Sequence, residues 1–118
     1  MVTITEDYVS FETAKLLKEK GFPITSINFK DLVFCMYDEN GGIQWGCYHP
    51  DWYARVTLQM AMKWLREVHK IDIWVEGWNR RYKGNFHSEQ RGVEALFYED
   101  SYEEAVETAI KYSLENLI

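Results

Sequence analysis

The chain has 118 residues, of which 47% are hydrophobic and 16% aromatic. This length and apolar content suit one domain with its own core and argue against intrinsic disorder, so residues 1–118 are predicted to form a single domain. The net charge of −6 disfavours general nucleic-acid binding, which depends on neutralising phosphates with basic side chains.

The sequence shows no pattern that would direct the chain to a membrane. Its first residues include acidic side chains where a signal peptide has basic ones, and no run of about 18 apolar residues occurs. We therefore expect a cytoplasmic protein without a membrane partner and with free thiols. The charge is uneven, since residues 55–98 contain eight basic and five acidic side chains.

The chain begins with a predicted helix over residues 11–20, which Ser10 precedes as a suitable N-cap. The periodicity then changes to that of extended strands. Residues 29–37 and 43–48 are predicted to form a hairpin, because residues 38–42 read Asp-Glu-Asn-Gly-Gly, a strong turn sequence.

A second predicted helix starts at Thr57, and its apolar residues are spaced to lie on one helical face. Strands are predicted over residues 71–78, 86–89 and 93–98. The polar, basic residues 79–85 between the first two of these strands are predicted to form a turn region.

A third helix is predicted to start at Ser101, where Glu104 completes a capping box. The hairpins between the helices favour antiparallel pairing, with parallel pairing of the strands on either side of the second helix as the alternative. The predicted fold is therefore α+β, with an antiparallel sheet of about four strands, three helices packed on one face, and the order α-ββ-α-ββ-α.

The middle of the chain is unusually rich in aromatic residues. In the strand 71–78, Trp74 and Trp78 share one face while Ile73 and Val75 share the other. If the aliphatic face meets the helices, the two Trp residues lie on the outer face, either packed across strands or available to a partner. The predicted platform consists of Trp45, Tyr48, Trp74 and Trp78.

A basic and aromatic segment follows over residues 78–87. Such a mixture can stack bases and hold phosphates, as in proteins that bind single strands. The candidate nucleic-acid contacts are Arg80, Arg81, Tyr82 and Lys83. A solvated turn is the alternative interpretation of this segment.

Cys35, Cys47 and His49 form the third candidate group. If the first hairpin loop is centred on Gly41, Cys35 lies opposite Cys47, and His49 shares the face of Cys47. These three side chains suggest a metal protein or an enzyme, with a second histidine as fourth ligand. The spacing lacks the CxxC or HxxxH pattern of zinc sites, so no metal, cofactor or catalytic residue is predicted.

Three segments that contain the predicted helices resemble one group of proteins. Residues Tyr8–Phe22, Thr57–His69 and Ser101–Ile118 are similar to short uncharacterised proteins of Bacteroides-type gut bacteria, often encoded near prophage or other mobile-element genes. The resemblance implies a bacterial, cytoplasmic and phage-derived accessory protein. That group has no assigned activity or site residues, and the segments between the helices do not share the resemblance.

These observations favour a small noncatalytic module that binds another protein, with homodimerisation through the open sheet face as its commonest form. A nucleic-acid contact through residues 78–87 is the first alternative. A metal protein or enzyme that uses Cys35, Cys47 and His49 is the second.

Overall fold

The structure is a computed structural model that describes residues 7–23, 35–46 and 49–118. Its elements, in chain order, are α1 (Phe11–Glu19), β1 (Cys35–Tyr37), β2 (Ile43–Trp45), β3 (Tyr53–Ala54), α2 (Leu58–His69), β4 (Asp72–Trp78), β5 (Arg81–Ser88), β6 (Gly92–Glu99) and α3 (Tyr102–Asn116). In this part of the chain, no helix has the length and apolar character that crossing a membrane requires.

The three predicted helix starts are confirmed by their caps. The side-chain oxygens of Ser10, Thr57 and Ser101 each accept a hydrogen bond from the backbone N–H three residues further on. Such bonds satisfy amide groups that have no partner within the helix. Helix α2 ends where Lys70 adopts a left-handed conformation, with φ of 57°.

The six strands of the described chain form two antiparallel sheets of three strands each, in the orders β2-β1-β3 and β4-β5-β6. The α+β class is confirmed, whereas the prediction of one sheet with about four strands in the order α-ββ-α-ββ-α is wrong. Among the described residues, three strands lie between α1 and α2 and three more between α2 and α3. The predicted strand residues 29–34 and 47–48 lie outside the described part of the chain.

The prediction of a turn over residues 79–85 is also wrong, because β5 begins at Arg81. The turn consists of Asn79 and Arg80, which both have positive φ angles, 51° and 61°. Two consecutive residues of this kind form a tight hairpin turn that matches the twist of the flanking strands. The polar residues that suggested a loop are instead part of a strand with one open side.

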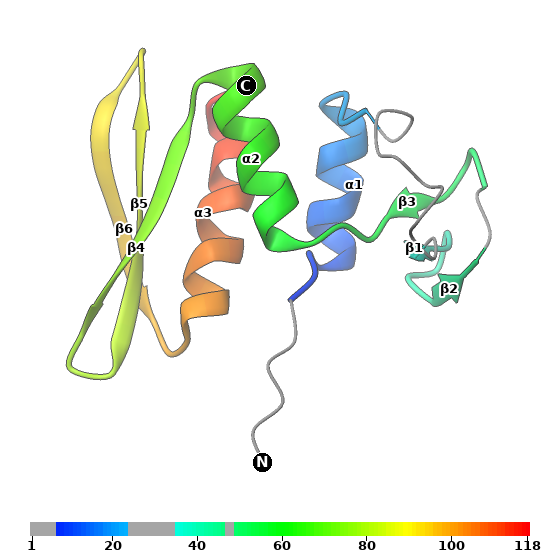
Figure 1. The fold of residues 1–118 in the computed structure, drawn as a ribbon, viewed down its shortest axis with the longest axis horizontal. Coiled ribbons are helices and arrows are strands. Elements are labelled where there is room, and N and C mark those ends of the chain that lie inside the picture. The colour runs from blue at the N-terminus through cyan, green and yellow to red at the C-terminus, as the bar shows by residue number, and fades with distance from the viewer. Residues whose placement is uncertain (1–6, 24–34, 47–48) are drawn as a thin grey trace.

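Helix α3 lies at the centre of the fold and contacts all three strands of the β4–β6 sheet as well as α1 and α2 (Figure 1). Figure 1 shows this sheet on one side of the helices and the small β1–β3 sheet on the far side, next to α1. The largest side chains of the core are almost fully buried: Leu17, Met36, Leu65, Ile71, Phe86, Ile110 and Leu114.

Candidate interaction surface

The β4–β6 sheet has one covered face and one open face. Ile73 and Val75 on β4, Phe86 on β5 and Leu96 on β6 pack against the core on the helix side. All three helices lie on that side of the sheet (Figure 1). Because successive side chains of a strand point to opposite faces, the intervening residues form the other face, called the outer face below.

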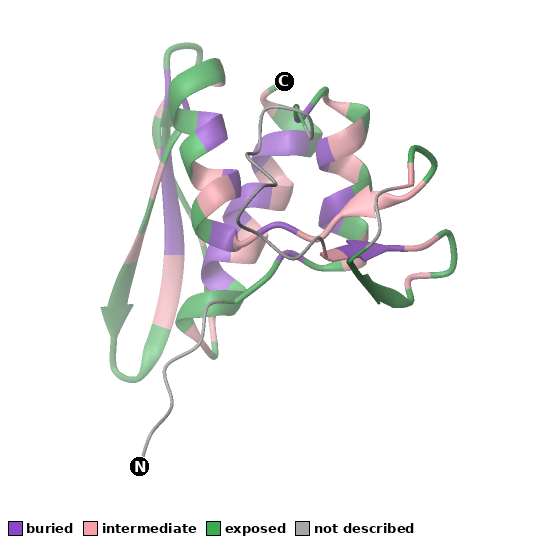
Figure 2. Cartoon of the chain, turned by 45° about the vertical axis from the view of Figure 1, so that its right-hand side comes forward, coloured by how far each residue is buried: buried purple, intermediate pink, exposed green. Residues whose placement is uncertain are grey.

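Large apolar side chains are exposed on the outer face. The exposed fractions are 37% for Trp74, 69% for Trp78, 66% for Val93, 89% for Phe97 and 37% for Tyr98. Figure 2 shows the buried residues of this sheet in the central strand, while β4 and β6 are exposed or intermediate. The expectation that Trp74 and Trp78 lie opposite the aliphatic face is confirmed.

A bulge in β6 increases the aromatic content of the outer face. Lys83 pairs with Tyr98 and Asn85 pairs with Ala95, so β6 has one more residue than β5 between these two pairs. Such a bulge places two residues opposite one and turns the strand locally. As a result, the consecutive residues Phe97 and Tyr98 both contribute to the outer face.

Trp78, Tyr98, Lys83 and Glu76 form one cluster on this face. The rings of Trp78 and Tyr98 have centroids 6.4 Å apart, and the Lys83 ammonium lies 5.5 Å from the Tyr98 centroid. Lys83 Nζ is also 3.6 Å from Glu76 Oε2. The ammonium group therefore has an aromatic and an anionic neighbour within its own chain.

Asn85 gives the outer face a polar centre. It lies on the central strand β5, paired with Trp74 on one side and Ala95 on the other. The residue is only 4% exposed, and within the described chain its Nδ2 has no hydrogen-bond acceptor. A buried donor without an acceptor costs about 1–3 kcal/mol.

The charges on the outer face are balanced. Strand alternation places the acidic Asp72 and Glu76 and the basic Arg81 and Lys83 on this side. Arg81 Nε lies 3.9 Å from a carboxylate oxygen of Asp100, and Lys83 pairs with Glu76. The face therefore lacks the excess of positive charge that phosphate binding requires.

The predicted aromatic platform is only partly assembled. Trp74 and Trp78 share the outer face, but Trp45 is on β2 in the other sheet, where it is 56% exposed. Tyr48 lies outside the described residues. Phe97 and Val93 were not among the predicted platform residues, although the alternation of residues 93–97 places them together on one face.

The four predicted nucleic-acid contacts are divided between the turn and both faces of the sheet. Arg80 is in the hairpin turn, while Arg81 and Lys83 lie on the outer face. Tyr82 faces the helices instead, and its ring meets that of Tyr102 edge to face with centroids 6.3 Å apart. The four side chains therefore do not form one continuous surface.

The expectation that Cys35 lies opposite Cys47 in the hairpin is wrong, because the residue opposite Cys35 on β2 is Trp45. The hairpin is centred on Asn40 rather than on Gly41, since Tyr37 pairs with Ile43. Cys47 itself lies outside the described residues. Among the described residues, no three His, Cys, Asp or Glu side chains are grouped as metal ligands would be.

The other two members of this candidate group have local partners. The thiol sulfur of Cys35 accepts a hydrogen bond of 3.4 Å from Arg55 Nη1. The His49 ring stacks on Trp52 with centroids 4.7 Å apart, and His49 Nδ1 accepts a hydrogen bond from Asp51 N. Cys35 and His49 therefore have separate partners, and no metal-ligand group among the described residues unites them.

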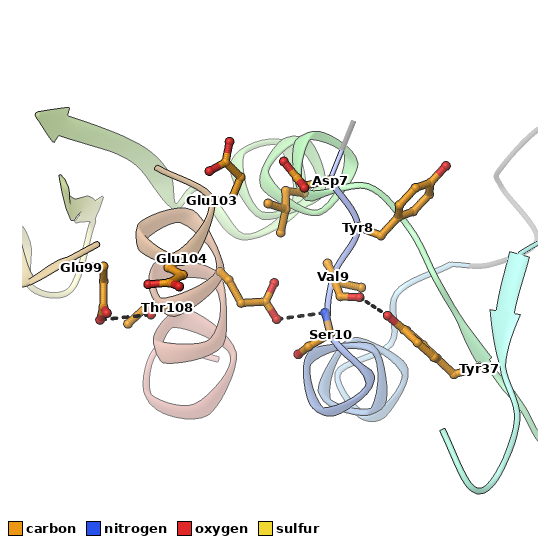
Figure 3. Close-up of a pocket in the computed structure, with 11 residues that line it drawn as sticks. Asp7, Tyr8, Val9, Ser10, Tyr37, Glu99, Glu103, Glu104 and Thr108 are labelled. Atoms are coloured by element: carbon orange, nitrogen blue, oxygen red, sulfur yellow. Dashed lines mark hydrogen bonds between the residues drawn. The ribbon is translucent and has the colours of Figure 1, made fainter. Parts of the chain in front are cut away.

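A second surface feature is an open acidic pocket of about 400 Å³ where the starts of α1 and α3 approach each other (Figure 3). Its carboxylates come from Asp7, Glu99, Glu103, Glu104 and Glu107. The pocket was not predicted from the sequence, because its lining comes from segments far apart in the chain.

Part of this acidic lining stabilises the fold. Glu107 Oε1 accepts hydrogen bonds from Ser10 N at 3.0 Å and from Thr13 Oγ1 at 2.6 Å. Thr108 Oγ1 donates to Glu99 at 3.5 Å, and Tyr37 Oη donates to Val9 O (Figure 3). Glu107 therefore connects α3 to the start of α1.

Comparison of the chain with models of protein families, with curated proteins and with solved structures finds no match. The chemistry of its surfaces is therefore the evidence that bears on function. Among the described surfaces, the outer face has the largest group of exposed aromatic side chains.

Proposed function

We propose that this chain is a noncatalytic interaction module that binds a protein partner through the outer face of the β4–β6 sheet. The observation that carries the proposal is the exposure of Trp74, Trp78, Val93, Phe97 and Tyr98 on one face. A whole aromatic side chain has about 150–250 Å² of surface, so these exposed fractions amount to roughly 600 Å² of apolar surface. That value is at the upper end of the roughly 300–600 Å² of the largest patch on a typical monomer, and such patches mark interaction sites.

The charge balance favours a protein partner over a nucleic acid. Two acidic and two basic side chains lie on the outer face, and Lys83 and Arg81 each have a carboxylate within 4 Å. In a typical protein interface, the core is rich in aromatic side chains and poor in charged ones, and the rim is polar. The chain as a whole has a net charge of −6, which repels a phosphate backbone.

The proposal also takes account of the resemblance of the helical segments to bacterial proteins. The helical segments resemble short uncharacterised proteins that are often encoded near bacterial prophage or other mobile-element genes, and a cytoplasmic interaction module is consistent with that resemblance. Because that group has no assigned activity, the proposal depends on the outer face alone.

Selection of peptides from a random phage-displayed library tests this function. We expect peptides enriched on the native chain to bind a Trp45→Ala variant equally well and to lose binding to a Trp78→Ala, Phe97→Ala double variant. Trp45 is a matched control, because it is an exposed Trp on the other sheet. Equal binding to the double variant, or no enrichment on a chain that is monomeric, would contradict the proposal.

A second experiment distinguishes a protein partner from a nucleic acid. Labelled single-stranded oligonucleotides are titrated at low salt with the native chain and with the same double variant. We expect no saturable binding, because the outer face has no excess positive charge. Tight binding that the double variant loses would replace the protein partner with a nucleic acid.

A further inference from the structure

We infer that the partner on the outer face is a second copy of this chain, arranged face to face about a two-fold axis. The inference rests on the proposed function, since it names the occupant of the same surface. Its first support is area. The roughly 600 Å² of apolar side-chain surface, together with the polar residues between and around it, approaches the 800 Å² or so that each partner buries in a standard interface.

The charge pattern of the face is complementary to itself. Glu76 and Lys83 lie opposite each other on neighbouring strands, and a two-fold interface brings the same patch of both copies together. A face with two acidic and two basic side chains can place each charge near an opposite one of the second copy. Each copy has a net charge of −6, yet the two copies meet through a surface that is itself neutral.

The larger group of acidic side chains lies elsewhere. Glu103, Glu104 and Glu107 are on α3, which packs against the opposite side of the sheet. Face-to-face pairing across the outer face keeps the two α3 helices apart, with both sheets between them. This arrangement reduces the repulsion that the net charge would otherwise cause.

Asn85 adds a polar group that a second copy is suited to complete. A carboxamide has both donors and an acceptor, so two Asn85 side chains related by a two-fold axis can bond to each other. In the single copy Asn85 Nδ2 is covered and lacks an acceptor among the described residues. For the two Asn85 side chains to bond to each other, the side chains that cover Asn85 must therefore move apart when the faces meet.

Sedimentation equilibrium over a concentration series tests the inference. We expect a dimer for the native chain and for Trp45→Ala, and at least about 30-fold weaker association for Phe97→Ala or Trp78→Ala, the size expected for aromatic residues that dominate an interface. Each of these substitutions acts twice, because a two-fold interface contains every residue twice. Far-ultraviolet circular dichroism confirms that the exposed substitutions leave the chain folded.

A charge-exchange pair gives a readout that only self-association produces. Glu76→Lys makes the outer face net positive by two charges, and Lys83→Glu makes it net negative by two, because each substitution replaces one charge with its opposite. Each variant alone is expected to self-associate more weakly than the native chain. An equimolar mixture of the two variants is expected to form mixed dimers.

Different outcomes separate failure of this inference from failure of the proposed function. A monomeric native chain whose selected peptides still require Trp78 and Phe97 would overturn the second-copy inference and leave the proposed function standing. A native dimer that is unaffected by substitutions at Trp78 and Phe97 would also overturn it, because the copies would then meet through another surface. Failure of the peptide selection together with a monomeric chain would contradict both the second-copy inference and the proposed function.

Discussion

Gly84 determines how closely helix α3 approaches the β4–β6 sheet. A Cβ atom at this position would lie 2.9 Å from the Ala105 carbonyl oxygen and 3.0 Å from Ala109 Cβ. Gly84→Ala is therefore expected to force the helix away from the sheet and to lower the free energy of unfolding by about 1–3 kcal/mol, the usual cost of overpacking a core. Urea denaturation measures the change.

Gly77→Ala is the matched control for this prediction, because Gly77 is also on a strand of the same sheet. An added Cβ at Gly77 would meet the Tyr82 ring at 3.1 Å, and Gly77 is exposed. The ring can move, whereas the Ala105 backbone cannot without shifting α3. Equal losses of stability for the two variants would show that α3 does not constrain Gly84.

At the residue scale, sequence reasoning worked where the signal was local. The caps Ser10, Thr57 and Ser101 were predictable because each bonds to a backbone group three residues away. The orientation of Trp74 followed from strand alternation alone. Tyr98 was harder to place, because its position beside Phe97 on the outer face depends on a bulge that only the pairing with β5 defines.

The β4–β5 hairpin shows how one turn controls a whole element. Arg80 has a φ of 61°, a left-handed conformation that costs a residue with a Cβ about 1–2 kcal/mol. Arg80→Gly produces the Asn-Gly sequence preferred in this type of turn. We expect it to raise the free energy of unfolding by about 0.5–1 kcal/mol, since the flexibility of glycine in the unfolded chain offsets part of the gain.

Thermal and urea denaturation measure this effect, and Arg80→Ala is the control because it removes the same charge but keeps the Cβ. The alanine variant is expected to gain no stability. If both variants gain equally, the benefit comes from removing the Arg80 charge beside Arg81 rather than from relief of the backbone.

At the element scale, the helices were predicted well and the strands less well. Helix boundaries follow from caps and from a repeat within one segment. The start of β5 was missed because Arg81 and Lys83 are polar, although each of them alternates with a residue on the covered face. The two-residue strand β3 was missed because a strand of this length carries almost no periodic signal.

At the scale of the whole molecule, the separation into two sheets could not be deduced from the sequence. Both β2 and β4 contain Trp, and nothing in the local sequence indicates that Trp45 and Trp74 belong to different sheets. The position of α3 between the β4–β6 sheet and the other two helices decides which strands can meet. Such long-range packing also creates the outer face, which explains why only its β4 part was predicted.

The stability of the whole molecule is expected to decrease in two stages as the pH falls. Burial lowers the pKa of His69 below its ordinary value of 6.5, and its ring lies edge to face on Trp64. The unfolded chain therefore binds this proton more readily, so the stability contribution is complete above pH 6.5 and decreases below it. The second decrease in stability, at lower pH, comes from Glu12 and Asp38. The pKa of Glu12 is lowered by its hydrogen bond with Lys111. The pKa of Asp38 is lowered by hydrogen bonds from Gln44 and from backbone amides.

These carboxylates contribute stability above their ordinary pKa values of 4.5 and 3.8 and lose it as the pH falls through their lower folded values. Urea denaturation at a fixed protein concentration, repeated from pH 8 to about pH 3, is expected to show both decreases. His69→Gln removes the titrating group and should abolish the first decrease while leaving the second. A first decrease that persists in His69→Gln would show that another group binds a proton more readily in the unfolded chain than in the folded one, and the burial of His69 would then not govern stability near neutral pH.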